Sequence, residues 1–398
     1  MQRAGMSIAW RGRVQLACAL VVSVFVLSFS SHGMARTSPV PDETETESVE
    51  YEAVRIGGAF EFPWSIAFLP DRSLLLTERM GRLRQIRPDG TVRDITGLPP
   101  IFSSGLAGLL DVAVDPDFAK NRQIYLSYVH GSAKHSTIRV IRAQLSRDDN
   151  RLIGKSVIFE STGAERDEQY GGRLAVTRDG YLFLTIGDRW DQERAQRLDD
   201  HLGTVIRIRT DGSVPPDNPF YGRKDAKPEI WSFGHRNAQG LAFDEDRGHL
   251  YAVEHGPMGG DELNRIERGR NYGWPVISHG IAYDGTPMPG GKAQDGMEQP
   301  AHVFGEPPAQ APSGLAIDSA GGSPILWVGT LAGQALLRLD WDGEDWRETR
   351  LLHEQLGRIR DVRVGPDGLL YVITDDLEGG LYRIDPIIEQ AGQPRPAR

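Results

Sequence analysis

The sequence predicts an all-β protein, a six-bladed β-propeller, from three features. The 398 residues include 46 Gly and 25 Pro, which favours many tight turns over long helices. Short apolar runs of strand length alternate with turns rich in Asp, Gly or Pro, and almost no stretch has helical periodicity. This strand–turn–strand unit recurs six times, and a four-stranded sheet repeated six times about an axis is a propeller. The six units begin at Pro63, Leu109, Gly172, Gln239, Ser313 and Ile359.

The segment that precedes the repeats has the pattern of a secretory signal. Three arginines come before the apolar run of residues 14–30, and a small-x-small cleavage site follows at residues 33–35. We therefore expect residues 1–35 to be a cleaved signal peptide. An uncleaved membrane anchor is the alternative, although the apolar run is slightly short for a spanning helix. The expected location is outside the cytoplasm, in the periplasm, with no stable membrane insertion after cleavage.

The expected propeller occupies residues 51–386 and is flanked by two short segments. Residues 36–50 are polar, acidic and Pro-containing, which predicts a disordered linker. Residues 387–398 form a C-terminal tail. Residues 51–56 have the pattern of a strand, and we expect them to close the ring as the outermost strand of the last blade. Two units carry insertions, around residues 165–169 and 277–310, of a length that is usually functional or mobile.

The charge and cysteine content exclude several classes of function. The chain has 45 Lys and Arg against 55 Asp and Glu, a net charge of −10, which argues against a nucleic-acid partner. The single cysteine, Cys18, lies in the expected signal peptide, so the mature chain has no disulfide or thiolate chemistry. The sequence also has no Walker loop, no dinucleotide-binding glycine motif after a strand and no zinc-ligand spacing.

Residues 228–275 carry the densest set of candidate site residues. The second strand of this stretch ends in the loop HGPMGGDELN, where the backbone carbonyls of Gly256 and Pro257 are adjacent. A hard cation such as Ca²⁺ takes oxygen ligands of this kind, and Asp261 and Glu262 place two carboxylates nearby. From the residues alone, the alternative that these groups are turn residues and solvated surface charges stays open.

Three motifs of this stretch, GHRNAQGLAFD, EHGPMGGDELN and NYGWP, resemble a known family when taken in this order. They are similar to those of the soluble PQQ-dependent aldose sugar dehydrogenases, the glucose/sorbosone dehydrogenase family. The resemblance covers nearly the whole chain after about Val54. It implies a pyrroloquinoline quinone (PQQ) at the propeller axis, a Ca²⁺ beside it, an aldose oxidised at its anomeric carbon and a separate electron acceptor. In the family, a His accepts the sugar's hydroxyl proton and an Asp orients that His.

The resemblance implies roles for several residues of this chain. Asp188, in the motif IGD, matches the carboxylate that orients the base, and Asn237 matches an amide beside the quinone. The Gly256–Pro257 pair matches the carbonyls that bind the catalytic Ca²⁺. Arg358 and Arg360 match the arginines that contact the cofactor's carboxylates, and their i, i+2 spacing would put both on one face of a strand. Without the resemblance, two solvated charges on a strand edge are an equal alternative for this pair.

Three positions depart from the family pattern. Gln169 stands where the family has its His base, nineteen residues before Asp188. A neutral amide cannot accept a proton at a useful pH. Leu106 replaces a Gln of the second repeat, and Ala332 replaces a Lys that stabilises the charge of the reduced quinone. We therefore expect PQQ-dependent aldose oxidation that is weakened by the loss of the usual base.

Neighbouring groups are candidates for the missing base, and other function classes stay open. Glu168 is adjacent, but the alternation of a strand would point it away from the position of the base. His201, His235 and His255 are further candidates, although each is more often a structural histidine. A Ca²⁺-dependent hydrolase or lactonase would need only the cation and a carboxylate such as Asp188 to activate water. A non-catalytic carbohydrate- or partner-binding propeller would be compatible with the three departures from the family pattern. The fold alone does not decide between these function classes.

Overall fold

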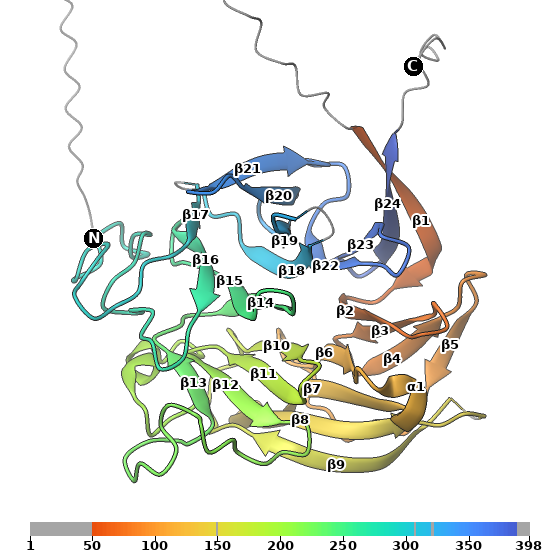
Figure 1. Cartoon of the computed structure of the whole chain (residues 1–398), viewed down its shortest axis with the longest axis horizontal. Helices are drawn as coiled ribbons and strands as arrows, with labels where there is room; N and C mark the ends of the chain where they lie inside the picture. The colour runs from red at the N-terminus through yellow and green to blue at the C-terminus, as the bar shows by residue number, and fades with distance from the viewer. Residues whose placement is uncertain (1–49, 149, 306–307, 320–321, 388–398) are drawn as a thin grey trace, which may run out of the picture. The chain divides into compact units, whose positions relative to one another are not determined.

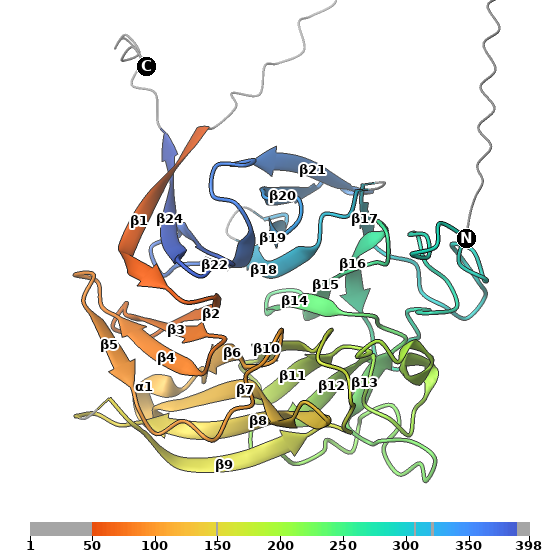
Figure 2. The same ribbon diagram turned by 180° about the vertical axis from the view of Figure 1, so that it is seen from behind.

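The computed structural model describes residues 50–148, 150–305, 308–319 and 322–387, which form six four-stranded sheets. The sheets follow one another around a central axis in chain order, as the colours in Figure 1 and the view from behind in Figure 2 show. The predicted all-β, six-bladed propeller is therefore confirmed. Helical structure in the described ranges is limited to α1 (Phe118–Asn121) and the short 3-10 helix η1 (Gln192–Gln196).

Each blade contains four strands, and the first five blades use four consecutive strands. Blade 1 contains β2 (Pro63–Phe68), β3 (Leu74–Glu78), β4 (Arg82–Ile86) and β5 (Val92–Ile95). Blade 2 contains β6 (Leu109–Val114), β7 (Gln123–Ser132), β8 (His135–Leu145) and β9 (Leu152–Glu160). Blade 3 contains β10 (Gly171–Val176), β11 (Tyr181–Ile186), β12 (Thr204–Arg209) and β13 (Ile230–Phe233).

The remaining blades complete the ring in the same way. Blade 4 contains β14 (Ala238–Asp244), β15 (His249–Glu254), β16 (Asp261–Ile266) and β17 (His302–Phe304). Blade 5 contains β18 (Pro312–Asp318), β19 (Ile325–Thr330), β20 (Leu336–Trp341) and β21 (Trp346–Leu351). Blade 6 contains β22 (Ile359–Val364), β23 (Leu370–Thr374), β24 (Gly379–Ile387) and the N-terminal strand β1 (Glu50–Phe60).

The ring closes through β1, which is the outermost strand of the last blade. It pairs antiparallel with β24, with Tyr51 opposite Pro386 and Ile56 opposite Leu381. A strand from before the first repeat thus completes the sheet of the last blade, as the strand pattern of residues 51–56 predicts. β1 begins at Glu50, the last residue of the expected linker. The expected signal peptide, the rest of the linker and residues 388–398 of the expected tail lie outside the described residues.

The hydrophobic core is divided among the spaces between neighbouring blades. On β3, Leu75 packs against blade 2, whereas the next residue, Leu76, packs against blade 6. Both side chains are fully buried. Because each sheet is covered on both faces, its inner strands are nearly continuous apolar runs rather than alternating ones. No helix in the described ranges has the length and apolar character that crossing a membrane requires.

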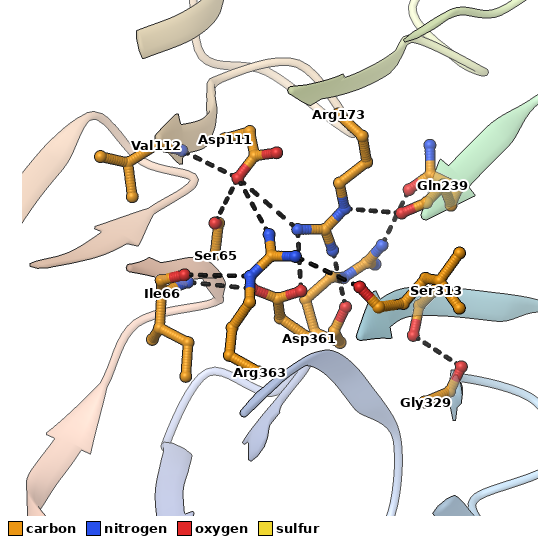
Figure 3. A network of polar contacts seen from close by, with 12 residues as sticks. Ser65, Ile66, Asp111, Val112, Arg173, Gln239, Ser313, Gly329, Asp361 and Arg363 are labelled. Atoms are coloured by element: carbon orange, nitrogen blue, oxygen red, sulfur yellow. Dashed lines mark hydrogen bonds and ion pairs between the residues drawn. The ribbon is translucent and has the colours of Figure 1, made fainter. Parts of the chain in front are cut away.

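The first strands of the blades meet around the axis in a buried ionic network, which Figure 3 shows. Its centre is Arg173 of β10, whose side chain is fully buried. Nη1 of Arg173 lies 3.0 Å from Oδ1 of Asp361 and 3.8 Å from Oδ1 of Asp111. The guanidinium also lies over the ring of Trp64, at 4.1 Å from the ring centre. Arg363 pairs with the same two carboxylates, at 3.4 Å from Asp111 and 3.3 Å from Asp361, so two arginines neutralise two carboxylates from blades 2 and 6.

Backbone groups extend this network to every blade. Nε of Arg173 donates to the carbonyl of Gln239 at 2.6 Å, and Asp361 accepts from the backbone N–H of Ile66 at 3.0 Å. Arg363 of β22 donates to the carbonyl of Leu315 at 3.3 Å. Because these groups belong to β2, β6, β10, β14, β18 and β22, the network fixes the six first strands relative to one another. The same strands carry the site at one end of the axis.

Candidate functional site

A cavity of about 340 Å³ lies at the axis and receives lining residues from all six blades. Most of these residues lie just before or at the beginning of the first strand of a blade, or follow its second strand. Six of the seven predicted site residues line it: Gln169, Asn237, Gly256, Pro257, Arg358 and Arg360. The seventh, Asp188, lies behind Gln169 and lines a neighbouring hollow of about 260 Å³. The predicted residues are thus brought together at one end of the propeller.

Gln169 and Asp188 are in direct contact. With the Gln169 amide oriented to satisfy both of its ends, Nε2 donates to Oδ1 of Asp188 and Oε1 accepts from Nη2 of Arg236 at 3.0 Å. The backbone of Gln169 has a φ of 50°, in the left-handed region. Residue 169 is therefore held beside the carboxylate that would orient a base, but both ends of its own amide are already used.

Asp188 is buried among aromatic side chains and hydrogen-bond donors. Its Oδ2 accepts from Nε1 of Trp274 at 2.8 Å, and Oδ1 accepts from the backbone N–H of Trp190 at 2.9 Å. Burial raises the pKa of Asp188 to about 6, although these donors and the Arg236 charge favour the ionised form. The carboxyl thus changes its protonation near the lower end of the physiological pH range.

The raised pKa of Asp188 predicts a pH dependence of stability. The ordinary pKa is about 3.8, so the folded chain holds this proton more tightly than the unfolded chain does. The free energy of unfolding should therefore fall by about 2–3 kcal/mol as the pH rises from about 4 to above 6, because the ionised carboxylate is disfavoured by burial. Asp188→Asn should remove this part of the fall. Urea unfolding of both proteins across this pH range checks it, and identical pH profiles would contradict it.

Among the described residues, four arginines line the cavity: Arg79, Arg236, Arg358 and Arg360. Arg358 and Arg360 share one oxygen of Asp375, at 3.0 and 2.9 Å. Although burial works against it, these two guanidinium groups lower the pKa of Asp375 to about 2. Within the described part of the chain, the buried Nε atoms of Arg79 and Arg360 have no hydrogen-bond partner. The cavity therefore has an excess of positive charge, and two of its arginines have a buried Nε–H that is not paired within the described residues.

Arg79 was not among the predicted site residues. It directly follows β3, the second strand of blade 1, and its guanidinium lies 4.5 Å from the ring centre of Phe62. The residues that follow the second strands of blades 4 and 6, His255 and Asp375, also lie at this cavity or pair with its arginines. Comparing this position from repeat to repeat is the sequence signal that identifies Arg79.

Gly256 and Pro257, in the loop after β15, line the cavity, but the polar groups of this loop have partners within the protein. Asp261 accepts from the backbone N–H of Gly256 at 2.8 Å, and its other oxygen accepts from those of Gln310 and Ala311 at 2.6 and 2.8 Å. Burial raises the pKa of Glu262 to about 8, which favours its neutral form. The carbonyl of Gly256 accepts from Nη1 of Arg236 at 2.7 Å. Of the oxygens expected near a cation, those of Asp261 and the Gly256 carbonyl therefore already have hydrogen-bond donors.

The three candidate histidines do not supply an evident base. His201 and His235 lie outside the lining of the cavity, each beside a glutamate at 3.5 and 2.9 Å. His255 lines the cavity, where its Nε2 donates to the carbonyl of Pro312 at 2.8 Å and its Nδ1 faces Nδ2 of Asn237 at 3.4 Å. Burial lowers the pKa of His255 to about 4. All three therefore have structural partners.

The structure corrects one expectation about the positions around Gln169. Strand alternation was expected to point Glu168 away from the cavity, but Glu168 and Gln169 both line it. The reason is local: β10 begins only at Gly171, and the left-handed backbone at Gln169 breaks any alternation.

Of the other positions that depart from the family pattern, Leu106 lines the cavity and is 48% exposed. Ala332 is not part of the lining, whereas the preceding residue, Leu331, is.

Comparison with known proteins agrees with this geometry. Residues 60–383 match the family model described as Glucose / Sorbosone dehydrogenase. The chain belongs to the glucose/sorbosone dehydrogenase family. The resemblance that its motifs suggested is thereby confirmed.

Relatives and solved structures of this family cover most of the chain. The aldose sugar dehydrogenase YliI of Escherichia coli (strain K12) is 38% identical over 341 residues, 82% of this chain and 90% of the relative. The crystal structure of the soluble aldose sugar dehydrogenase from Escherichia coli in the apo-form has a TM-score of 0.79 and 34% identity, covering 85% of this chain and 100% of that one. The PQQ-bound aldose sugar dehydrogenase of Streptomyces coelicolor has a TM-score of 0.72 and 26% identity, covering 85% and 99%. This glucose/sorbosone dehydrogenase family member therefore has the family's fold along nearly all of its propeller.

Proposed function

We propose that this protein oxidises aldose sugars at the anomeric carbon, with PQQ as the hydride acceptor. The observation that carries the proposal is the cationic axial cavity, which four arginines line and in which, within the described ranges, Arg79 and Arg360 each have a buried Nε without a hydrogen-bond partner. A donor set of this kind fits an anionic cofactor with several carboxylates. Family membership and the PQQ-bound relative support the choice of PQQ among such anions.

The residues of the cavity divide into cofactor-binding and substrate-facing groups. Arg358 and Arg360 share a single carboxylate, so both retain donors for the cofactor's carboxylates. Asn237 contributes an amide at the cavity wall. Gly256 and Pro257 would hold a Ca²⁺ through their carbonyls, with the cation replacing the Arg236 guanidinium at the Gly256 oxygen. When bound, the quinone supplies the two-electron oxidant and the cation polarises it. The sugar would bind beside Gln169, and the electrons would pass to a separate acceptor.

The other functions considered have less support from the geometry. A hydrolase or lactonase would need a carboxylate that activates water at the cation. Asp188 lies behind Gln169 with both oxygens hydrogen-bonded, and both oxygens of Asp261 bind backbone N–H groups. If the quinone binds without turnover in the experiment below, that result would favour a non-catalytic binding propeller.

The apolar N-terminal segment supports secretion to the periplasm as part of the proposal.

The test is PQQ binding and PQQ-dependent, dye-linked aldose oxidation, measured with a matched pair of arginine variants. Arg358→Met should weaken PQQ binding about 10- to 100-fold, because a charge-assisted hydrogen bond contributes about 1.5–3 kcal/mol. Arg383→Met is the control, since Arg383 also pairs with an aspartate but lies on β24, outside the cavity lining. Ca²⁺ should raise the melting temperature and restore the activity that EDTA removes. Equal PQQ affinity of the two variants would contradict the proposed binding mode.

A further inference from the structure

We propose that Glu168 is the general base of this enzyme and accepts the proton of the sugar's anomeric hydroxyl. The inference rests on the proposed function and assigns the proton-accepting role that Gln169 cannot fill. Three features carry it: the position of Glu168 in the cavity wall, the engagement of every other candidate acceptor there, and an available carboxylate oxygen.

Glu168 reaches the cavity because the chain before β10 is not a strand. The left-handed φ of 50° at Gln169 turns the backbone so that both Glu168 and Gln169 line the cavity. The buried Arg189 fixes this loop from behind. Its Nε donates to the carbonyl of Glu168 at 2.9 Å, and its guanidinium lies 3.8 Å from the ring centre of Tyr170. The carboxylate is therefore attached to a restrained segment next to the position of the family's base.

The other candidate proton acceptors in the lining are already engaged. Asp261 accepts from three backbone N–H groups through its two oxygens. His255 donates through Nε2 to a carbonyl, and its Nδ1 faces the Asn237 amide. The Gln169 amide is hydrogen-bonded at both ends and is in any case not a base. Among the described residues that line the cavity, Glu168 is the remaining carboxylate.

The Glu168 carboxylate is anchored at one oxygen only. Oε2 accepts from the indole Nε1 of Trp190, and within the described part of the chain Oε1 accepts no hydrogen bond. Trp190 is held in turn, because its backbone N–H donates to Asp188. One oxygen thus sets the orientation of the group, and the other is free to accept a proton from a substrate hydroxyl.

The proposed step is balanced in atoms and electrons. The O1–H bond of the aldose breaks and its proton passes to Oε1 of Glu168. The C1–H bond breaks with its electron pair, which leaves as hydride to the bound ortho-quinone, the two-electron oxidant. A C1=O bond forms, and the sugar leaves as the lactone. Because Glu168 lines the cavity and is also exposed to solvent, it can return its proton to water.

The test compares Glu168→Gln with Glu165→Gln, each loaded with PQQ and Ca²⁺. Glu165 is also exposed and lies in the same loop, but outside the cavity lining. We expect unchanged PQQ affinity in both variants, measured by absorbance titration, and a loss of aldose oxidation of about 10²–10⁴-fold in Glu168→Gln alone. In Glu168→Ala, added formate should restore part of the activity, which a merely structural role of Glu168 would not allow.

The possible outcomes separate this inference from the proposed function. Wild-type turnover that survives Glu168→Gln would overturn the role of Glu168 and leave the proposed function standing. Loss of PQQ binding in Glu168→Gln, or no rescue of Glu168→Ala by formate, would also overturn it and make Glu168 a structural residue. Absence of PQQ binding by the wild type would overturn the proposed function, and this inference with it.

Discussion

Gln169→His should restore aldose oxidation by about 10²–10⁴-fold in a chain that lacks the Glu168 carboxylate. A positioned general base contributes a factor of this size, and residue 169 already lies in contact with Asp188, which can orient an imidazole. The left-handed backbone at this position suits the change, because His is among the residues that adopt a positive φ more readily than most. In the wild-type background we expect a smaller gain, since Glu168 already accepts the proton there.

Asp188→Asn supplies the control for this gain. The amide can no longer stabilise the imidazolium or fix its tautomer, so adding Asp188→Asn to Gln169→His should reverse most of the gain. The measurement is dye-linked aldose oxidation by each variant after reconstitution with PQQ and Ca²⁺. Brisk wild-type activity that neither Gln169→His nor Glu168→Gln changes would mean that the proton is accepted elsewhere in the cavity.

Arg173→Met should lower the free energy of unfolding by about 3–5 kcal/mol, the cost of breaking a buried ion pair on one side. The substitution leaves Asp111 and Asp361 buried at the axis with Arg363 as their one shared guanidinium, so one buried negative charge is no longer balanced (Figure 3). It also removes the hydrogen bonds that Arg173 donates to blades 4 and 6. Urea unfolding of the two proteins measures the difference.

Two further variants keep this expectation testable. Arg383→Met breaks an arginine–aspartate pair near the surface and should lower stability far less, because solvent screens such pairs. Combining Arg173→Met with Asp361→Leu should recover part of the lost stability, since Arg363 then balances the remaining Asp111 carboxylate. A single variant as stable as the wild type would contradict the role assigned to the network.

The fold was predictable because its information is local and repeated. Each unit carries its own strands and turns, so six copies and one additional strand at residues 51–56 were enough to predict a closed ring. Both faces of each sheet are covered, which explains the apolar runs that marked the strands. The contact of Gln169 with Asp188 followed from the family motifs, which record how distant segments meet at the axis.

Other parts of the site depend on features that the sequence does not display. Glu168 was expected to point away because alternation assumes a strand, whereas one left-handed residue turns it into the cavity. Asp261 was expected near a cation, but it binds N–H groups of Gln310 and Ala311, far along the chain. Arg79 is a single arginine after a strand, and only the ring brings it beside Arg360.

The most direct test of the account is an anaerobic reduction of bound PQQ by an aldose. The purified chain is mixed with one equivalent of PQQ and with Ca²⁺, freed of unbound cofactor by gel filtration, and followed by absorbance after an aldose is added. We predict that PQQ is retained by the protein and is then converted completely to its reduced form, more slowly in Glu168→Gln than in Glu165→Gln. PQQ that passes through the column unbound, or bound PQQ that stays oxidised in the presence of the aldose, would contradict the proposed function.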